Sequence, residues 1–150
     1  MIKILVTIVF IVACVALGAL SGASNVPGEW YQSLDKPFFN PPGWIFAPVW
    51  TVLYVMIGVA LSAIWFEEDN RRLLVLFAIQ AALNLLWSPA FFGLHSPVLG
   101  LVIIVPLLVT ILMFIAAGWQ KNRTAAWLFV PYALWVAFAT VLNLSIVLLK

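Results

Sequence analysis

Charged side chains are scarce in this sequence, and their scarcity excludes a water-soluble globular domain. Asp and Glu number 5 and Lys and Arg number 7 among 150 residues, so charged residues are 8% of the chain, against roughly a quarter in soluble domains. Hydrophobic residues are 66%, too many for a surface that faces water. We interpret residues 1–150 as a single membrane domain, with no internal repeat that would divide it.

Cysteine and histidine are almost absent, which excludes several kinds of site. The single thiol, Cys14, leaves no disulfide framework and no Cys-ligated zinc site. The single histidine, His95, does not support a histidine-rich metal site or a haem held by two strong axial ligands. We therefore predict no metal site and no obligatory cofactor. Because no basic run is interleaved with aromatics, nucleic acid is not an expected partner.

Five stretches contain no Asp, Glu, Lys or Arg, and each is close to the length that a helix needs to cross a bilayer. Backbone groups in hydrocarbon must be paired within their own segment, which favours helices. We predict an all-α membrane protein, a five-transmembrane-helix bundle, with helices at about 4–20, 48–66, 73–92, 98–117 and 125–149. Because no span carries a charge, proton-coupled transport is disfavoured.

The first stretch has an alternative interpretation as a cleaved signal peptide, because Lys3 precedes an apolar run that ends in small residues. We favour a retained helix, since the run is longer than a signal peptide requires. Cys14, Gly18 and Gly22 recur every four residues and form a small-residue face suited to helix packing. Together with Ala78 and Ala82 in the third span, this face suggests a homodimer.

The positive charges predict an orientation. Five spans place Lys3, Arg71, Arg72, Lys121 and Arg123 on one side of the membrane, and Lys36 and Lys150 on the other. The positive-inside rule then puts the amino terminus inside.

The long connection at 21–47 differs from a disordered linker, because disordered segments avoid aromatic residues. It contains six aromatic residues and four prolines: Trp30, Tyr31, Phe38, Phe39, Trp44, Phe46, Pro27, Pro37, Pro41 and Pro42. Proline restrains both itself and its predecessor, so the segment is stiff. We predict an ordered loop that acts as a lid over one end of the bundle. The alternative is an aromatic belt at the membrane interface with no ligand.

Polar and aromatic side chains share one face on each of three predicted helices. Gln80, Asn84, Trp87 and Phe91 follow helical spacing on the third span. Trp50 and Tyr54 do so on the second span, and Tyr132, Trp135, Ala139, Leu142 and Asn143 on the fifth. Rings beside amides and hydroxyls suit a pocket for a flat, largely apolar ligand with a few polar edges. Alternatively, the amides only bond across helices and the rings fill space.

Three motifs resemble a known family. The segment from Trp30 to Tyr54, WYQSLDKPFFNPPGWIFAPVWTVLY, resembles the signature of the TspO/MBR (tryptophan-rich sensory protein) family, the bacterial relatives of the mitochondrial translocator protein, or peripheral benzodiazepine receptor. The segments NLLWSPAFFG from Asn84 and PYALWVAFATVLN from Pro131 resemble the family's third-helix and fifth-helix motifs. The resemblance covers nearly the whole chain.

The resemblance implies a five-helix bundle in a bacterial membrane, commonly assembled as a homodimer. It implies a pocket that binds protoporphyrin IX, haem and isoquinoline carboxamides. Position by position, the implied ligand-binding residues are Tyr31, Phe38, Pro41, Trp50, Tyr54, Asn84, Trp87, Ser88, Trp135, Ala139 and Leu142.

Two departures from the family pattern limit what is carried over. Position 38 is Phe, where relatives often have Trp, and residues 140–150 lack the tyrosine of the animal proteins' proposed cholesterol motif. We therefore do not predict cholesterol binding. The leading hypothesis is porphyrin sensing, handling or transport. One alternative is a light- and oxygen-dependent porphyrin-degrading enzyme with Trp50 and Trp135 as candidate catalytic residues, and another is a passive transporter of small apolar molecules.

Overall fold

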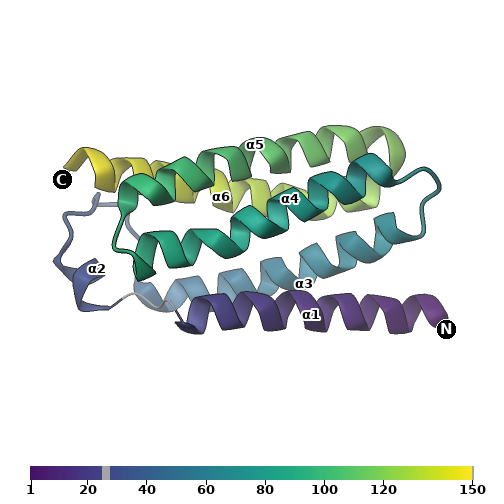
Figure 1. Cartoon of the computed structure of the whole chain (residues 1–150), viewed down its shortest axis with the longest axis horizontal. Coiled ribbons are helices and arrows are strands. Elements are labelled where there is room, and N and C mark those ends of the chain that lie inside the picture. Colours follow the sequence, from purple (N-terminus) through teal and green to yellow (C-terminus); the bar gives the residue numbers. More distant parts are fainter. Residues whose placement is uncertain (25–27, 150) are drawn as a thin grey trace.

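The computed structural model describes residues 1–24 and 28–149, which are largely helical (Figure 1). Within that part, five helices are long and apolar enough to cross a membrane, which confirms the predicted all-α bundle. They are α1 (Ile2–Ser24), α3 (Phe46–Trp65), α4 (Arg71–Ser88) with a π-helical continuation η2 (Pro89–Gly93), α5 (Pro97–Lys121) and α6 (Arg123–Leu149).

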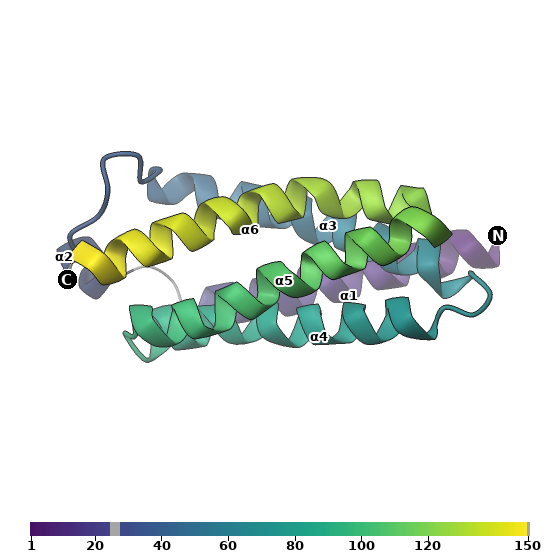
Figure 2. The same cartoon turned by 90° about the horizontal axis from the view of Figure 1, so that it is seen from above.

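The helices form an elongated bundle in which α1 packs along α3, α3 along α6, α6 along α5, and α5 along α4. The amino terminus, the α3–α4 connection and the α5–α6 connection lie at one end, and α2, the α4–α5 connection and the carboxyl-terminal part of α6 at the other (Figures 1 and 2). Short connections make successive helices antiparallel. Lys3, Arg71 and Lys121 thus share one end, as predicted, and the side of the membrane that this end faces stays a prediction.

The helix ends differ from the predicted bounds by a few residues, because charge-free stretches do not report local capping. The Ser96 hydroxyl accepts a hydrogen bond from the Leu99 amide at 3.1 Å, and Pro97 follows at the first helical position, so α5 begins there. Lys121 extends its far end, where a cation suits the helix dipole. At Pro89, which lacks an N–H, α4 changes to the π-helical η2.

The long connection contains two short helices that the sequence did not predict, α2 (Glu29–Ser33) and the 3-10 turn η1 (Gly43–Ile45). Tyr31 in α2 is buried and donates a hydrogen bond from its hydroxyl to Asn40 Oδ1 at 3.0 Å. The Lys36 ammonium donates to the Tyr31 carbonyl at 2.8 Å. The described part of the connection is thus tied together locally, whereas Pro27 lies outside the described residues. Its action as a lid stays a prediction.

Close helix contacts depend on two glycines. A methyl group at Gly58 would meet the backbone of Ile11 at 2.7 Å, so only glycine lets α1 and α3 approach this closely. A methyl group at Gly18 would overlap the Tyr54 ring. Gly18 therefore packs against Tyr54 of the same chain and is not free for the small-residue face predicted for a homodimer. Ala78 and Ala82 on α4 are exposed and remain open for such a contact.

Candidate functional site

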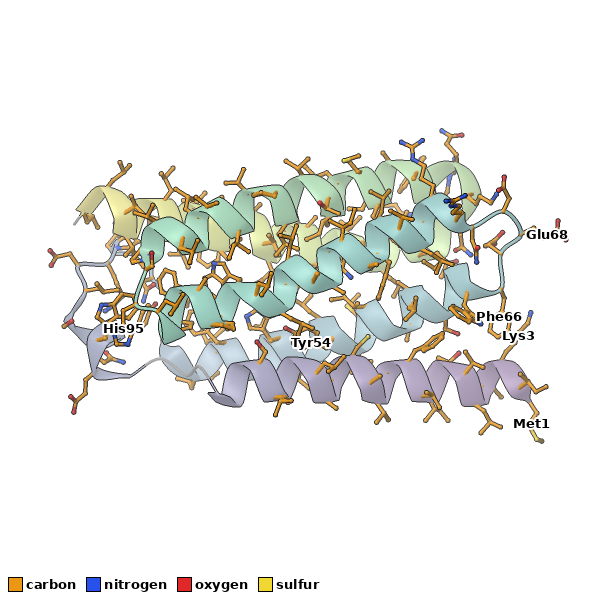
Figure 3. All side chains as sticks on the ribbon, in the orientation of Figure 1. Met1, Lys3, Tyr54, Phe66, Glu68 and His95 are labelled. Atoms are coloured by element: carbon orange, nitrogen blue, oxygen red, sulfur yellow. The ribbon has the colours of Figure 1, made fainter. Side chains whose placement is uncertain are left out.

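A cavity of about 500 Å³ lies between the helices, in the half of the bundle that carries α2. Every one of the five long helices contributes to its wall, together with Tyr31 of α2 and Gly43 of η1. Tyr54 lies about midway along the bundle (Figure 3). The remaining lining residues are Val15, Gly18, Ala19, Gly22, Phe46, Ala47, Trp50, Thr51, Tyr54, Asn84, Trp87, Ser88, Phe91, Phe92, Ile104, Leu107, Trp135, Ala139, Leu142, Asn143 and Ile146.

Aromatic rings from different helices meet around this cavity. The rings of Trp50 and Tyr54 stack at 5.5 Å between centroids, as one helical turn between them allows. Trp135 from α6 meets Trp50 edge to face at 6.5 Å. On the α4 side, Trp87 stacks on Phe91 at 5.0 Å. The rings therefore support one another in the offset and edge-on geometries that aromatic pairs prefer, and present an apolar wall.

A chain of hydrogen bonds links the cavity wall to the interior behind it. The Tyr54 hydroxyl donates to Asn84 Oδ1 at 2.6 Å, and Asn84 Nδ2 donates to the Tyr132 hydroxyl at 2.6 Å. The Tyr132 hydroxyl donates in turn to Gln80 Oε1 at 2.8 Å. Tyr132 and Gln80 are fully buried, and neither lines the cavity. The amides predicted to bond across helices do so, and they also place polar atoms in an apolar wall.

A second polar group lies nearer the α2 end. The Trp87 indole N–H donates to Asn143 Oδ1 at 3.1 Å, and Asn143 Nδ2 donates to the Pro97 carbonyl at 2.7 Å. This pairing holds α4, α6 and the start of α5 together. The buried indole N–H of Trp135 has no acceptor among residues 1–24 and 28–149.

The connection contributes Tyr31 to the cavity wall. Its ring meets Phe91 edge to face at 6.2 Å and Phe92 at 5.4 Å, so α2 is packed against η2. Beside it, Trp30 stacks on His95 at 4.7 Å, with nearly parallel rings; His95 lies at this end in Figure 3. Burial raises the pKa of the Tyr31 phenol, partly opposed by its hydrogen bond to Asn40. The hydroxyl therefore remains a neutral donor at physiological pH.

The structure brings together most of the predicted site residues. Those on the cavity wall are Tyr31, Trp50, Tyr54, Asn84, Trp87, Ser88, Trp135, Ala139 and Leu142. Phe38 and Pro41 are not on it: the Phe38 side chain is 99% exposed and touches Phe39, and Pro41 is half-buried in the connection. Whether these two contact a ligand stays a prediction.

Sequence reasoning did not identify the contributions of α1 and α5 to the wall. Gly18 and Ala19 of α1, and Ile104 and Leu107 of α5, line the cavity without any polar or aromatic group to mark them. The spacing of Gly18 indicates helix packing in general and does not mark it as a cavity residue. Phe91, which shares the face of Gln80, Asn84 and Trp87 by its spacing, lines the cavity from η2, a π-helical turn that no sequence pattern predicts.

The side chains of the cavity wall are suited to contacting and orienting a ligand more than to acid–base or metal chemistry. Its lining residues include no Asp, Glu, Lys or Arg. No cluster of three or more His, Cys, Asp and Glu side chains occurs within the described part of the chain. What the wall provides is ring surface, with a phenol and amide groups at a few fixed points.

Comparison with known proteins supports a family assignment. The model of the TspO/MBR family matches residues 8–149. The chain is 44% identical to the tryptophan-rich protein TspO of Chlorobaculum tepidum over 143 residues, covering 91% of this chain and 90% of that protein. It is 38% identical to the protein of the same name from Archaeoglobus fulgidus, covering 99% and 97%.

An animal protein is also similar: the translocator protein of Bos taurus is 40% identical over 139 residues, covering 85% of this chain and 80% of that protein. The match to the family model, at residues 8–149, includes all five long helices, the first of them from residue 8 on, and the connection between α1 and α3. With five apolar helices in the structure, the chain is an integral membrane protein, and it belongs to the TspO/MBR family.

Proposed function

We propose that the chain binds a flat, largely apolar tetrapyrrole, such as protoporphyrin IX or haem, and serves in porphyrin sensing, handling or transport. The observation that carries this proposal is the cavity of about 500 Å³, with rings from α3, α4 and α6 on its wall. This volume lies within the roughly 300–1,000 Å³ of ordinary ligand pockets. Family membership adds support, because the resemblance implies porphyrin ligands.

The wall matches the chemistry of such a ligand. Trp50 and Trp135 offer ring surface to a planar macrocycle, and apolar contact supplies most of the affinity. Tyr54 and Asn84 supply the few polar atoms that orient it. An isoquinoline carboxamide has the same two components, a flat ring system and a polar amide, and is expected to compete. In this proposal the connection that carries Tyr31 acts as the lid that controls entry.

The test is a titration of the purified chain in detergent with protoporphyrin IX, followed by the Soret band. We expect Trp50→Ala or Trp135→Ala to weaken binding by about 1–3 kcal/mol each, the contribution of a buried aromatic contact. Trp127→Ala is the matched control, because Trp127 is exposed on the same helix as Trp135 and does not line the cavity. Unchanged affinity in both cavity variants would refute the proposal.

A light- and oxygen-dependent porphyrin-degrading activity is a second candidate, favoured by the edge-to-face pair of Trp50 and Trp135 on the wall. Indoles are electron donors, and a bound, illuminated porphyrin would lie against both. The expected result is loss of the Soret band on illumination in air, abolished by Trp→Phe at either position while binding persists. Equal bleaching of free porphyrin in the same detergent would exclude the activity.

Passive transport is a third candidate, favoured by the position of Trp135. This residue lines the cavity and also an outward-facing apolar groove between α3 and α6, which is bordered by Val52 and Leu134. An apolar molecule could pass between the membrane and the cavity at this wall. Porphyrin flux into sealed vesicles should then rise in Trp135→Ala. Equal flux through vesicles with and without the protein would exclude transport.

We also propose a homodimer through the outer face of α4, where Ala78 and Ala82 are exposed. Small residues let two helices approach closely in lipid. Cross-linking in bilayers should yield dimers that Ala78→Trp disrupts. Recovery of monomer alone from the unaltered chain would refute the proposal.

A further inference from the structure

We propose that Gln80 and Tyr132, which lie behind the cavity wall, determine whether Tyr54 offers a bound ligand a hydrogen-bond donor or an acceptor. The inference rests on the proposed cavity function and assigns a specificity role to two residues that do not line the cavity. Both are fully buried. Their hydrogen bonds lead to the cavity through Asn84, which bonds Tyr132 on one side and Tyr54 on the other.

The three hydrogen bonds that link Tyr54 to Gln80 all run in one direction. Tyr54 donates to Asn84, Asn84 donates to Tyr132, and Tyr132 donates to Gln80. The only hydroxyl proton of Tyr54 is thereby used inside the protein, at 2.6 Å from Asn84 Oδ1. In this direction the Tyr54 oxygen has only lone pairs left for a ligand, so it acts as an acceptor.

Gln80, at the interior end of this series of hydrogen bonds, shows why their direction is not fixed. Nε2 of Gln80 is buried and has no hydrogen-bond acceptor among the described residues. An amide exchanges its oxygen and nitrogen by a half turn, with almost no change in shape, and a hydroxyl rotates freely to suit. After half turns of Gln80 and Asn84, Gln80 Nε2 donates to Tyr132, Tyr132 to Asn84 Oδ1, and Asn84 Nδ2 to Tyr54.

The two directions contain the same number of hydrogen bonds and are therefore close in free energy. The observed direction leaves both N–H groups of Gln80 unpaired, and the reversed one leaves one N–H and the carbonyl oxygen unpaired. Buried unpaired N–H groups are rarer than underused carbonyls. Reversal thus costs little, and it frees the Tyr54 proton for the cavity. A ligand with a donor selects the observed direction, and a ligand with an acceptor selects the reversed one.

Gln80 makes both directions possible because its amide carries a donor and an acceptor. In Gln80→Leu neither remains, so the Tyr132 hydroxyl can donate only to Asn84 Oδ1. Asn84 must then donate to Tyr54, and Tyr54 presents a donor to the cavity permanently. The variant should accept acceptor ligands as before and lose its preference for donor ligands. Tyr132→Phe removes the hydroxyl that accepts the hydrogen bond from Asn84 Nδ2. Without that acceptor Asn84 donates to Tyr54 instead, which is the state that Gln80→Leu favours.

The probes are three flat tricycles of matched shape: carbazole with an N–H donor, 9-fluorenone with a carbonyl acceptor, and fluorene with neither. Each is titrated calorimetrically into the full chain in detergent micelles, and its partition into empty micelles is subtracted. In the unaltered chain, carbazole and fluorenone should both bind more tightly than fluorene. In Gln80→Leu the carbazole-to-fluorenone affinity ratio should fall about three- to tenfold, the range expected for one hydrogen bond.

The controls separate this role from a structural one. Thr110→Val also removes a buried hydroxyl, but that hydroxyl donates to the Pro106 carbonyl within α5, so the affinity ratio should not move. General destabilisation would weaken all three probes together and leave their ratios unchanged. If Gln80→Leu does not fold, Tyr132→Phe provides the same test, because it removes one oxygen and keeps the ring.

The outcomes are distinct. An unchanged carbazole-to-fluorenone ratio in both variants overturns the inference. Equal binding of all three probes to the unaltered chain also overturns it, while leaving the cavity as a binding site. Failure of every probe to bind removes the cavity proposal and the inference with it. A fall in the ratio that is confined to the Gln80 and Tyr132 variants supports the inference.

Discussion

The two halves of the bundle use the same kinds of side chain to opposite effect. In the half near the amino terminus, Phe114 and Phe129 stack at 4.0 Å and Phe77 meets both, and all three are buried. In the half near α2, the rings of Trp50, Trp135 and Trp87 stand around a cavity of about 500 Å³. Aromatic content therefore does not decide whether a bundle is filled or hollow.

What differs is which residues face the rings. In the hollow half, small residues lie on the wall, among them Gly18, Ala19 and Ala139, so that no side chain occupies the centre. The Tyr54 and Asn84 side chains are bonded to each other, which keeps them on the wall. Because lipid is as apolar as the side chains, packing and hydrogen bonding decide such arrangements in a membrane.

The largest expected effect concerns the filled half. Phe129→Ala should lower the free energy of unfolding by about 3–5 kcal/mol, because it removes a fully buried ring that packs on Phe114 and Phe77. Porphyrin affinity should change much less than in Trp50→Ala, since Phe129 does not line the cavity and reaches it only at second hand, by packing on Tyr132. Unfolding in mixed micelles with increasing sodium dodecyl sulfate measures the first quantity, and a Soret titration the second.

Trp50→Ala provides the reciprocal control, because its expected loss is in porphyrin affinity and its ring already borders open space. If Phe129→Ala weakened porphyrin binding as much as Trp50→Ala does, the two halves would not be independent, and the contrast between them would fail.

A smaller effect is expected at the boundary of the cavity. Gly18→Ala places a methyl group within the Tyr54 ring, which must move and strain its hydrogen bond to Asn84. The expected loss of stability is about 1–3 kcal/mol, typical of overpacking, accompanied by weaker porphyrin binding. The same two measurements apply as for Phe129→Ala.

Gly22→Ala is the matched control, because Gly22 lies one turn further along α1 and also lines the cavity, yet an added methyl would meet nothing within 4 Å among the described residues. Equal losses in the two variants would contradict the view that Gly18 is required for its contact with Tyr54, because Ala favours a helix more than Gly does and the loss at Gly22 would have no contact to explain it.

The sequence predicted the five helices because each is a charge-free run of membrane-spanning length, a property that depends on no neighbour. It also predicted Trp50, Tyr54, Asn84 and Trp135 as wall residues, since helical spacing and the family resemblance agree there. It did not predict α2, whose five residues have no periodic signal. The direction of the Tyr54–Gln80 chain was equally beyond it, because an amide shows its pairing only once its neighbours are placed.

The smallest expected effect tests how the hollow half is held open. Trp87→Phe keeps a ring on the wall but removes the indole N–H that donates to Asn143 at 3.1 Å. Asn143 still donates to the Pro97 carbonyl, so only one hydrogen bond is lost, and stability should fall by about 0.5–1.5 kcal/mol. Trp127→Phe, at an exposed position on α6, should leave stability unchanged in the same unfolding measurement. Equal stability of the Trp87 variant and the unaltered chain would mean that ring packing alone, and not the polar contact between α4 and α6, keeps this half from collapsing.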